Sequence, residues 1–441
     1  MPTSIYVCVI SEFTLPTLEA CLSLRPEHIV LIASDGETFA QQARHLQGLL
    51  HERLEGSRVE ILSHASTGEH LGGDHITANQ AWLAAHLVPR LQEVAHQGGI
   101  CAANLTGGTK AMALALAACH DWQRLDYQPL GNKPMQSVRA SHQPHYQAQP
   151  STERHLHDAQ PLDIALLHNE KARISKPNPV REHPLALALA QSLWDAQQAL
   201  QPALQALFSG FERIWVHERG QHQQTHITQT WTQFLANSSH ALNHLDDIRT
   251  WVTQLGQLHI PALLYADAQG ITLPGNASSK ADKQRQYLRD WISGDWLEQL
   301  VRHWLVQQGI PTSAMECNII CAGEDASGSQ READLLVHHR HVTSLIEIKA
   351  GLPPHKATAE LETQLSSLGS RFGKTRKALF LGPQALRAMR AQRRSEDFWL
   401  RCRANQVTLL LMPEQLYRFV QGENKIWPDL KRGQVPPEFA R

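Results

Sequence analysis

The chain has 441 residues and a formal net charge of -1, and hydrophobic residues make up 42% of it. This length exceeds one ordinary hydrophobic core and predicts two or three domains, while the apolar fraction excludes a disordered chain. No apolar run approaches the length of a membrane span and no leader sequence opens the chain, so we expect a cytoplasmic protein without membrane contact. The seven cysteines form no CxxC pair, which favours free thiols over disulfides or a zinc knuckle.

The first third of the chain alternates strand and helix patterns. Short apolar segments predict strands at residues 5–10, 28–34, 58–64 and 100–105, and helical periodicity lies between them at 37–51 and 76–95. Continuous apolar strands separated by helices indicate a parallel sheet that is covered on both faces. We therefore predict an α/β chain whose N-terminal domain, residues 1–145, is Rossmann-like with a doubly wound parallel sheet.

A glycine-rich turn follows the fourth of these strands. Thr106, Gly107 and Gly108 can bring backbone N–H groups close to a ligand. Thr109 can cap the next helix, and Lys110 adds positive charge at the helix N-terminus, where anions bind well. The spacing matches neither a P-loop nor GxGxxG, and an ordinary tight turn would use the same residues. Its place at the carboxyl end of a parallel strand favours a ligand site.

The end of the first strand lies at the same edge of the predicted sheet. The segment VISEFTLPTLEAC places Ser11, Thr14 and Pro16 there. We predict that these three residues face the glycine-rich turn across one ligand-binding rim.

The middle region, residues 146–285, carries no chemistry that the sequence identifies. Residues 141–182 are rich in His, Gln, Pro and Ser and are typical of a linker. A mostly helical stretch is predicted at 185–255, followed by a short hairpin around 268–270.

The last part, residues 286–441, is predicted to be a second, mixed α/β domain. It opens with an amphipathic helix at 294–309. The other predicted elements are strands at 315–321 and 378–382, two strands within 332–351, and a helix at 355–368. From residue 331 to 441 there are 19 Lys and Arg against 11 Asp and Glu, an excess of eight positive charges. This excess suits a polyanion partner, although a solvated basic face also produces it.

Charged residues interrupt two segments of this domain that otherwise resemble sheet core. In LIEIK, Glu347 and Lys349 share one face because residues two apart in a strand point the same way. If this strand pairs with ADLLV as a hairpin, Asp334 comes beside Glu347. Two adjacent carboxylates repel unless a cation or a proton lies between them, and a hard divalent metal prefers oxygen ligands of this kind. The lysine can then stabilise negative charge on a phosphate.

Two further residues can reach the same place. Glu298 lies at the edge of the apolar face of its helix, and Gln364 lies on the helix that follows the lysine. A salt-bridged hairpin on the surface would also produce the Asp-x12-Glu-x-Lys spacing. The apolar setting and the preceding helix favour a catalytic metal site.

The segments GDWLEQLV, READLLV and LIEIKAG resemble the PD-(D/E)XK nuclease superfamily, and they look most like the version fused to a CARF domain, the CRISPR-associated Rossmann fold. The resemblance implies a restriction-endonuclease-like domain that cleaves phosphodiesters with Mn²⁺ or Mg²⁺. It implies that Asp334 and Glu347 bind the metal, that Lys349 is the catalytic lysine, and that Glu298 is the acid of the preceding helix. The proline-aspartate start of the motif is absent, since Ala333 precedes Asp334.

The same resemblance covers roughly residues 1–140 and 286–390 and implies a ligand-controlled dimer. Two protomers of a homodimer would bind one cyclic oligoadenylate, expected to be cyclic tetra-adenylate, across their two-fold axis. The expected role is a nuclease of type III CRISPR defence that cleaves single-stranded DNA, RNA or both, or nicks duplex DNA. Three alternatives stay open: a ligand-responsive nucleic-acid-binding regulator without catalysis, a ring nuclease that degrades its own ligand, and a restriction-type endonuclease without ligand control.

Overall fold

The computed structural model describes most of the chain between residues 4 and 439. The segments outside the description are 12–13, 72–73, 129–134, 139–151, 155–158, 170, 176–177, 199–201, 215–225, 237–241, 259–263, 275–282, 322–330, 352–371, 373–374, 392–394 and 428–433. The predicted helix at 355–368, with Gln364, therefore lies outside the described residues. Among the described helices, none combines the length and the apolar composition that crossing a bilayer requires.

A seven-stranded sheet forms the N-terminal part, in the order β3-β2-β1-β4-β5-β6-β7. Its strands are β1 (Ser4–Val9), β2 (His28–Ile32), β3 (Arg58–Leu62), β4 (Ile100–Asn104), β5 (Arg124–Tyr127), β6 (Met135–Val138) and β7 (Thr152–Arg154). The first five pair in parallel, as predicted, while β6 and β7 add an antiparallel edge that the sequence did not predict.

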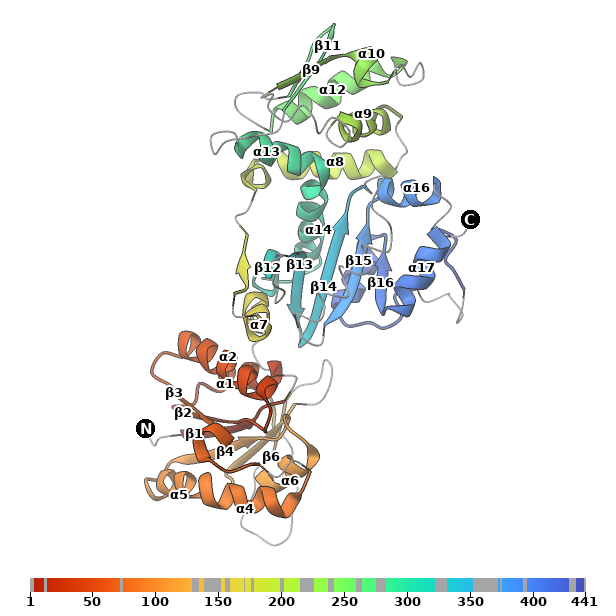
Figure 1. The fold of residues 1–441 in the computed structure, drawn as a ribbon. Coiled ribbons are helices and arrows are strands. Elements are labelled where there is room, and N and C mark those ends of the chain that lie inside the picture. The colour runs from red at the N-terminus through yellow and green to blue at the C-terminus, as the bar shows by residue number, and fades with distance from the viewer. Residues whose placement is uncertain are drawn as a thin grey trace.

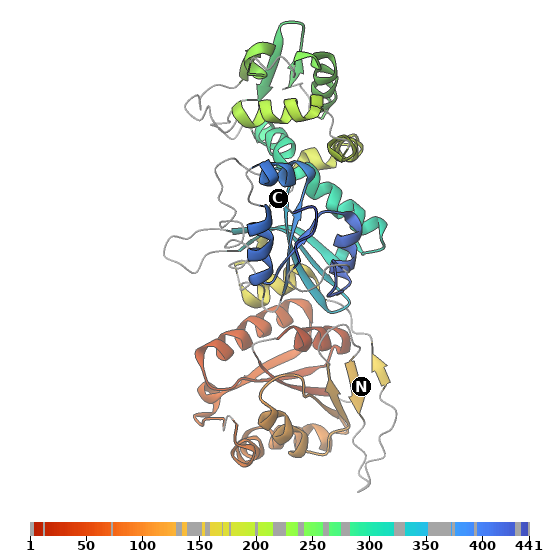
Figure 2. The same cartoon turned by 90° about the vertical axis from the view of Figure 1, so that its right-hand side faces the viewer.

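Helices cover both faces of this sheet because its strands are apolar on both sides. On one face, Tyr6 and Cys8 pack with α1 (Leu15–Leu24) and α2 (Glu37–Arg53). On the other face, Val7 packs with the remaining helices, which are α4 (Ile76–His86), α5 (Val88–His96) and α6 (Lys110–Ala118). The predicted helix at 76–95 is thus two helices, since α4 gives way to α5 at Leu87, one residue before a Val-Pro start. The short α3 (His64–Thr67) follows β3. The strand order reverses between β1 and β4, which is where such sheets bind ligands (Figures 1 and 2).

A six-stranded mixed sheet forms the C-terminal part, in the order β16-β15-β14-β13-β12-β8. Its strands are β8 (Arg173–Ile174), β12 (Met315–Cys321), β13 (Arg331–His339), β14 (Val342–Lys349), β15 (Arg376–Leu381) and β16 (Val407–Leu410). The edge strand β8 comes from the segment that the sequence predicted as a linker, and it pairs with β12. β13 and β14 form the predicted hairpin, so the mixed α/β architecture is confirmed.

The two faces of this second sheet bury different helices. Residues of α14 (Trp296–Gln307) and α18 (Pro413–Val420) pack on one face with Val337 and Ile346. Residues of α7 (Pro161–His168), α16 (Pro383–Ala391) and α17 (Ser395–Ala404) pack on the other with Leu336 and Leu345. The 3-10 turns η1 (Pro179–Glu182) and η6 (Thr312–Ala314) and the π-helical turn η5 (Trp291–Asp295) complete this part.

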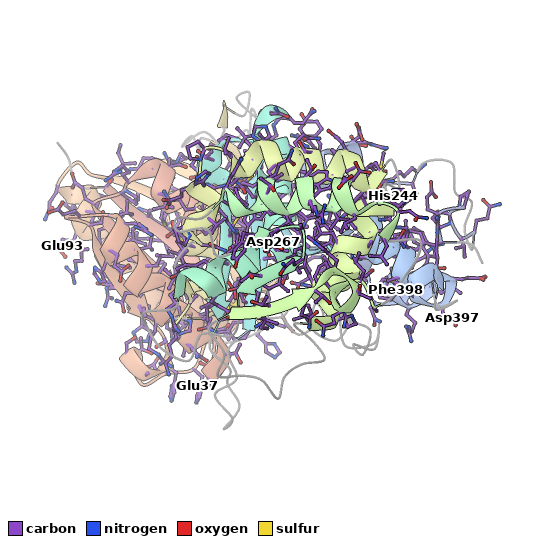
Figure 3. The ribbon with its side chains drawn as sticks, turned by 90° about the horizontal axis from the view of Figure 1, so that it is seen from above. Glu37, Glu93, His244, Asp267, Asp397 and Phe398 are labelled. Atoms are coloured by element: carbon purple, nitrogen blue, oxygen red, sulfur yellow. The ribbon has the colours of Figure 1, made fainter. Side chains whose placement is uncertain are left out.

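The middle region lies at the far end of the molecule from the N-terminal sheet (Figure 1). Its helices are α8 (Ala186–Gln198), α9 (Pro202–Glu212), α10 (Trp231–Phe234), α12 (Leu245–Gly256) and α13 (Lys283–Asp290), with a small sheet of β10 (Tyr265–Ala266), β11 (Gly270–Pro274) and β9 (His226–Thr230). The hairpin predicted around 268–270 is confirmed, whereas β9 was not predicted. Figure 3 views this end from above, where Asp267 and His244 are labelled. The predicted domain divisions at 145 and 285 remain proposals.

Candidate functional site

The hairpin of β13 and β14 brings two predicted acids and the lysine together. Its paired residues end at Leu335 opposite Ile346, so Asp334 and Glu347 follow next on the two strands. The Ile348 N–H and Lys349 Nζ both donate to Asp334 Oδ2, at 2.8 and 3.1 Å. Lys349 Nζ also lies 2.6 Å from Glu347 Oε1. One ammonium group therefore joins both carboxylates.

This cluster is largely withdrawn from water. The exposed fraction of the side chain is 14% for Asp334, 22% for Lys349 and 7% for Glu347. Burial alone would lower the pKa of Lys349, but the two carboxylates outweigh it and hold that pKa well above its usual value. Lys349 is thus a permanent cation within reach of any anion that approaches the acids.

Glu298 meets the cluster from α14. Burial and the negative charge of Asp334 raise the pKa of Glu298 to about 8, against the opposing effect of Arg181. Arg181 Nη2 lies 2.5 Å from Glu298 Oε2 and 3.2 Å from Asp295 Oδ2. The structure therefore brings Glu298 near enough to Asp334 for their charges to interact, with one carboxylate oxygen held by an arginine that the sequence did not identify. The ligand atoms of Glu298, Asp334 and Glu347 do not all lie within 4.8 Å of one another.

Arg181 is held in place by residues from three separate segments. It lies in η1, and its Nη1 donates to Asn318 Oδ1 at 3.2 Å, while Gln299 Nε2 donates to its backbone carbonyl. Asn318 has a φ of 58°, a left-handed conformation that Asn adopts more readily than most residues. Asn178, which caps the turn that carries Arg181, donates to Asp295 Oδ2 at 2.8 Å. Asp295 lies three residues before Glu298, so helical spacing could have identified it, but no local pattern marks Arg181.

The charges of the cluster do not balance. Among the described residues, four acids, Asp295, Glu298, Asp334 and Glu347, share two cations, Arg181 and Lys349. Since the raised pKa of Glu298 leaves this acid protonated at neutral pH, one negative charge remains in excess. The pKa of Asp290 is also raised, to about 6. Burial is the main cause, and the negative charge of nearby carboxylates such as Asp295 adds to it. A surplus of buried carboxylates fits a divalent cation, and the donor set is the oxygen-rich one that Mn²⁺ and Mg²⁺ take.

Replacing Arg181 with Met should lower the free energy of unfolding by about 3 kcal/mol, because Glu298 and Asp295 would stay buried without their cation. The matched control is Arg44→Met, which removes an exposed ion pair with Glu37 and should cost less than about 1 kcal/mol. Urea unfolding followed by tryptophan fluorescence measures both. Equal, small changes in the two variants would show that the Arg181 network contributes no special stability.

The glycine-rich turn packs directly against the end of β1. A Cβ at Gly107 would lie 1.8 Å from the Val9 carbonyl oxygen and 3.7 Å from the Ser11 nitrogen, so only glycine fits this approach. Gly108 has a φ of +76°, which also favours glycine. Thr109 caps α6 by accepting from the Met112 N–H at 3.3 Å.

The other predicted rim residues lie at different depths. Lys110 is exposed and begins α6, Ser11 is partly buried, and Thr14 and Pro16 are buried at the start of α1. Thr106 Oγ1 accepts from the Gln128 N–H at 2.8 Å. The structure therefore joins the glycine-rich turn to the end of β1, with Lys110 as its exposed charge.

Two buried polar atoms lie at the same edge of the sheet. Thr14 follows β1, and Asn104 ends β4, directly across from Cys8 of β1. Within the part of the chain that the structure describes, Thr14 Oγ1 and Asn104 Nδ2 have no hydrogen-bond partner. Asn104 was not predicted, although it stands first in the segment NLTGGTK that carries the turn.

The comparisons with known proteins concern the whole chain. No family model and no curated protein sequence matches it. Among solved structures, protein VC1899 from Vibrio cholerae is 14% identical, with a TM-score of 0.64 over 95% of this chain and 96% of that chain. Can2 from Sulfobacillus thermosulfidooxidans, solved in complex with cyclic tetra-adenylate, is 16% identical, with a TM-score of 0.57 over 95% and 96% of the two chains. At these identities the likeness establishes architecture: the chain has the predicted fold, an N-terminal Rossmann-like domain with a doubly wound sheet together with a C-terminal mixed α/β domain.

Proposed function

We propose that this chain is a metal-dependent nuclease of type III CRISPR defence that a cyclic oligoadenylate, cyclic tetra-adenylate first, switches on. The observation that carries the proposal is the cluster of Asp334, Glu347 and Lys349 on the central hairpin of the second sheet. Support comes from the fold, which is shared with a protein solved with cyclic tetra-adenylate bound. A structural salt bridge would need one acid for one lysine, whereas this cluster holds a surplus of acids.

In this proposal Glu298, Asp334 and Glu347 hold Mn²⁺ or Mg²⁺. The ion, when bound, neutralises phosphate charge and lowers the pKa of a coordinated water. Lys349 remains cationic and orients and stabilises the anionic scissile phosphate. Arg181 orients Glu298 by holding one of its carboxylate oxygens.

The proposed sensor is the rim formed by the glycine-rich turn and the end of β1. Lys110 and the N-terminus of α6 attract phosphate, and Ser11 and Thr106 supply polar groups beside it. A cyclic ligand with an even number of nucleotides fits a two-fold axis, so we propose that a cytoplasmic homodimer binds one ring.

A cleavage assay on single-stranded DNA, duplex DNA and RNA tests the proposal, with and without cyclic tetra-adenylate and Mn²⁺. We expect cleavage only when both are present, because the metal completes the site and the ligand controls it. Cleavage with metal alone would favour a restriction-type endonuclease, and ligand consumption without substrate cleavage would favour a ring nuclease. Ligand and DNA binding without any cleavage would favour a regulator.

A further inference from the structure

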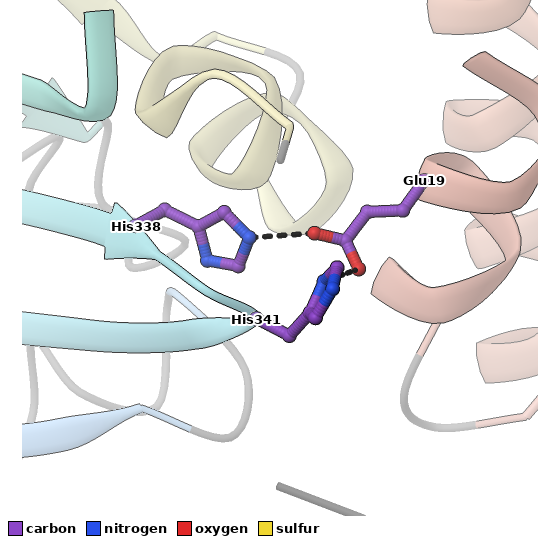
Figure 4. A group of neighbouring side chains, drawn as sticks. All are labelled: Glu19, His338 and His341. Atoms are coloured by element: carbon purple, nitrogen blue, oxygen red, sulfur yellow. Dashed lines mark hydrogen bonds and ion pairs between the residues drawn. The ribbon is translucent and has the colours of Figure 1, made fainter. Parts of the chain in front are cut away.

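A buried carboxylate of the N-terminal part meets two histidines of the C-terminal hairpin (Figure 4). His338 Nε2 lies 2.6 Å from Glu19 Oε1, and His341 Nδ1 lies 2.9 Å from Glu19 Oε2. The exposed fraction of the side chain is 2% for Glu19, 0% for His338 and 10% for His341. Each carboxylate oxygen of Glu19 thus has its own histidine.

The separations are those of hydrogen bonds. Ligand atoms around a tetrahedral zinc ion lie roughly 3.3 Å apart, given metal–ligand bonds of about 2.0–2.1 Å. The 2.6 Å between His338 Nε2 and Glu19 Oε1 is shorter than this. His338 Nδ1 is also engaged, at 2.9 Å from the Thr343 hydroxyl across the hairpin. The arrangement is therefore a hydrogen-bonded contact between two parts of the chain.

The contact lies between the two candidate sites. Glu19 is on α1, which begins directly after Thr14 of the predicted ligand rim. His338 is on β13, four residues after Asp334, and His341 is in the turn that leads into β14, the strand of Glu347. A displacement of α1 therefore acts on the same hairpin that carries the acids.

Opening the contact has a cost that makes it a two-state element. A carboxylate this deeply buried is unstable without its hydrogen-bond donors. Burial would raise the pKa of Glu19, but the hydrogen bonds from His338 and His341 outweigh it, so that pKa lies below its usual value. We therefore expect the two hydrogen bonds of Glu19 to form and break together, so that α1 takes one of two discrete positions against the hairpin.

Two other contacts between the two parts have no partner on the hairpin itself. Arg53 on α2 pairs with Asp163 on α7 at 2.6 Å, and His45 lies 3.3 Å from the Leu167 carbonyl. These contacts anchor α2 to α7. Although α7 packs against β13, neither pair includes a residue of β13 or β14, so Arg53 provides a comparison that spans the same boundary through a different pair.

We infer that Glu19, His338 and His341 form the latch through which the state of the N-terminal rim reaches the acids of the C-terminal hairpin. The inference rests on the proposed function for its ligand and its catalytic output. Its structural premise, that the latch orders the hairpin, does not depend on either.

The test compares wild type with His341→Ala, Glu19→Met and the control Arg53→Met. Hydrogen exchange is measured without ligand in peptides covering residues 331–349. Loss of the latch should speed exchange there by about tenfold, as expected when a buried hydrogen bond is lost, and the control should not. His341→Ala is the milder variant, because this side chain is at the edge of the contact.

Stimulation of cleavage by cyclic tetra-adenylate is then measured in the same proteins. It should fall by at least about fivefold in the two latch variants, within the usual range of allosteric coupling, while calorimetry shows that ligand affinity is retained. Unchanged exchange and unchanged stimulation in both variants would overturn the latch. Stoichiometric binding of Zn²⁺ or Co²⁺ at micromolar concentration, lost in Glu19→Met, would replace it with a metal site. Absence of ligand binding in wild type would instead overturn the proposed function, and the ligand-free exchange would still show whether the contact orders the hairpin.

Discussion

Changing Asp334 to Asn, or Glu347 to Gln, is expected to slow cleavage by about 100- to 1,000-fold without loss of cyclic tetra-adenylate binding. Each change removes one negative charge from the group proposed to bind the metal but keeps the shape of the side chain. In Asp334→Asn the new amide carbonyl can still accept from the Ile348 N–H, as Asp334 Oδ2 does, so the hairpin should keep its structure. Single-turnover cleavage at saturating Mn²⁺ and ligand measures the effect, and calorimetry measures ligand affinity.

The control for this pair is Glu332→Gln. Glu332 lies on the same strand two residues before Asp334 and is exposed, and it belongs to the same READLLV segment. Its replacement should leave the cleavage rate within about twofold of wild type, since an exposed charge is largely screened by solvent. If Glu332→Gln were inactive and Asp334→Asn still cleaved the substrate, Glu332 would replace Asp334 as the proposed metal ligand.

Placing alanine at Gly107 is expected to damage both stability and the sensor. The added Cβ would lie 1.8 Å from the Val9 carbonyl oxygen and 2.9 Å from its carbon, and these are backbone atoms of a central strand that cannot move aside cheaply. We expect the free energy of unfolding to fall by about 1–3 kcal/mol, as for other overpacked sites. Affinity for cyclic tetra-adenylate should fall by at least about tenfold, because the turn must move away from β1.

Gly48→Ala is the matched control for Gly107→Ala. Gly48 lies within α2, and a Cβ there would have no neighbour within 4 Å among the described residues. Alanine should therefore be neutral or stabilise by up to about 1 kcal/mol, through its higher helix propensity. Thermal unfolding and calorimetry measure both variants. A destabilised Gly107→Ala protein with wild-type affinity would make the turn structural and move the ligand elsewhere.

Local patterns in the sequence were sufficient for most elements near the sites. The strand at 315–321 and the two strands of the hairpin were predicted because their apolar runs are bounded by turns and by a polar His-Arg-His segment. β9 was missed because its sequence, HITQT, is short and mostly polar. The break between α4 and α5 was missed although Pro89 lies there, because the apolar periodicity continues across it.

Contacts between distant segments could not be predicted in the same way. Arg181 lies in a segment whose composition is that of a linker, and it reaches Glu298 117 residues later in the chain. Glu19 lies in the segment VISEFTLPTLEAC, which was singled out for Ser11, Thr14 and Pro16. Its partner His338 is 319 positions away in the chain. A single sequence contains no signal for such pairs, because each partner is locally ordinary and only tertiary packing brings the two together.

The short edge strand β8 has a consequence for anyone who wishes to join the C-terminal domain to another protein. β8 covers β12, and the turn that carries Arg181 follows it, yet both precede helices α8 to α13 in the chain. A fragment cut at residue 286 would leave β12 as an open edge, which invites pairing between copies, and would strip Glu298 of its guanidinium partner. A fragment that folds on its own must therefore begin at α7 and keep helices α8 to α13 as an insertion, or it must be a circular permutant that restores β8 and η1.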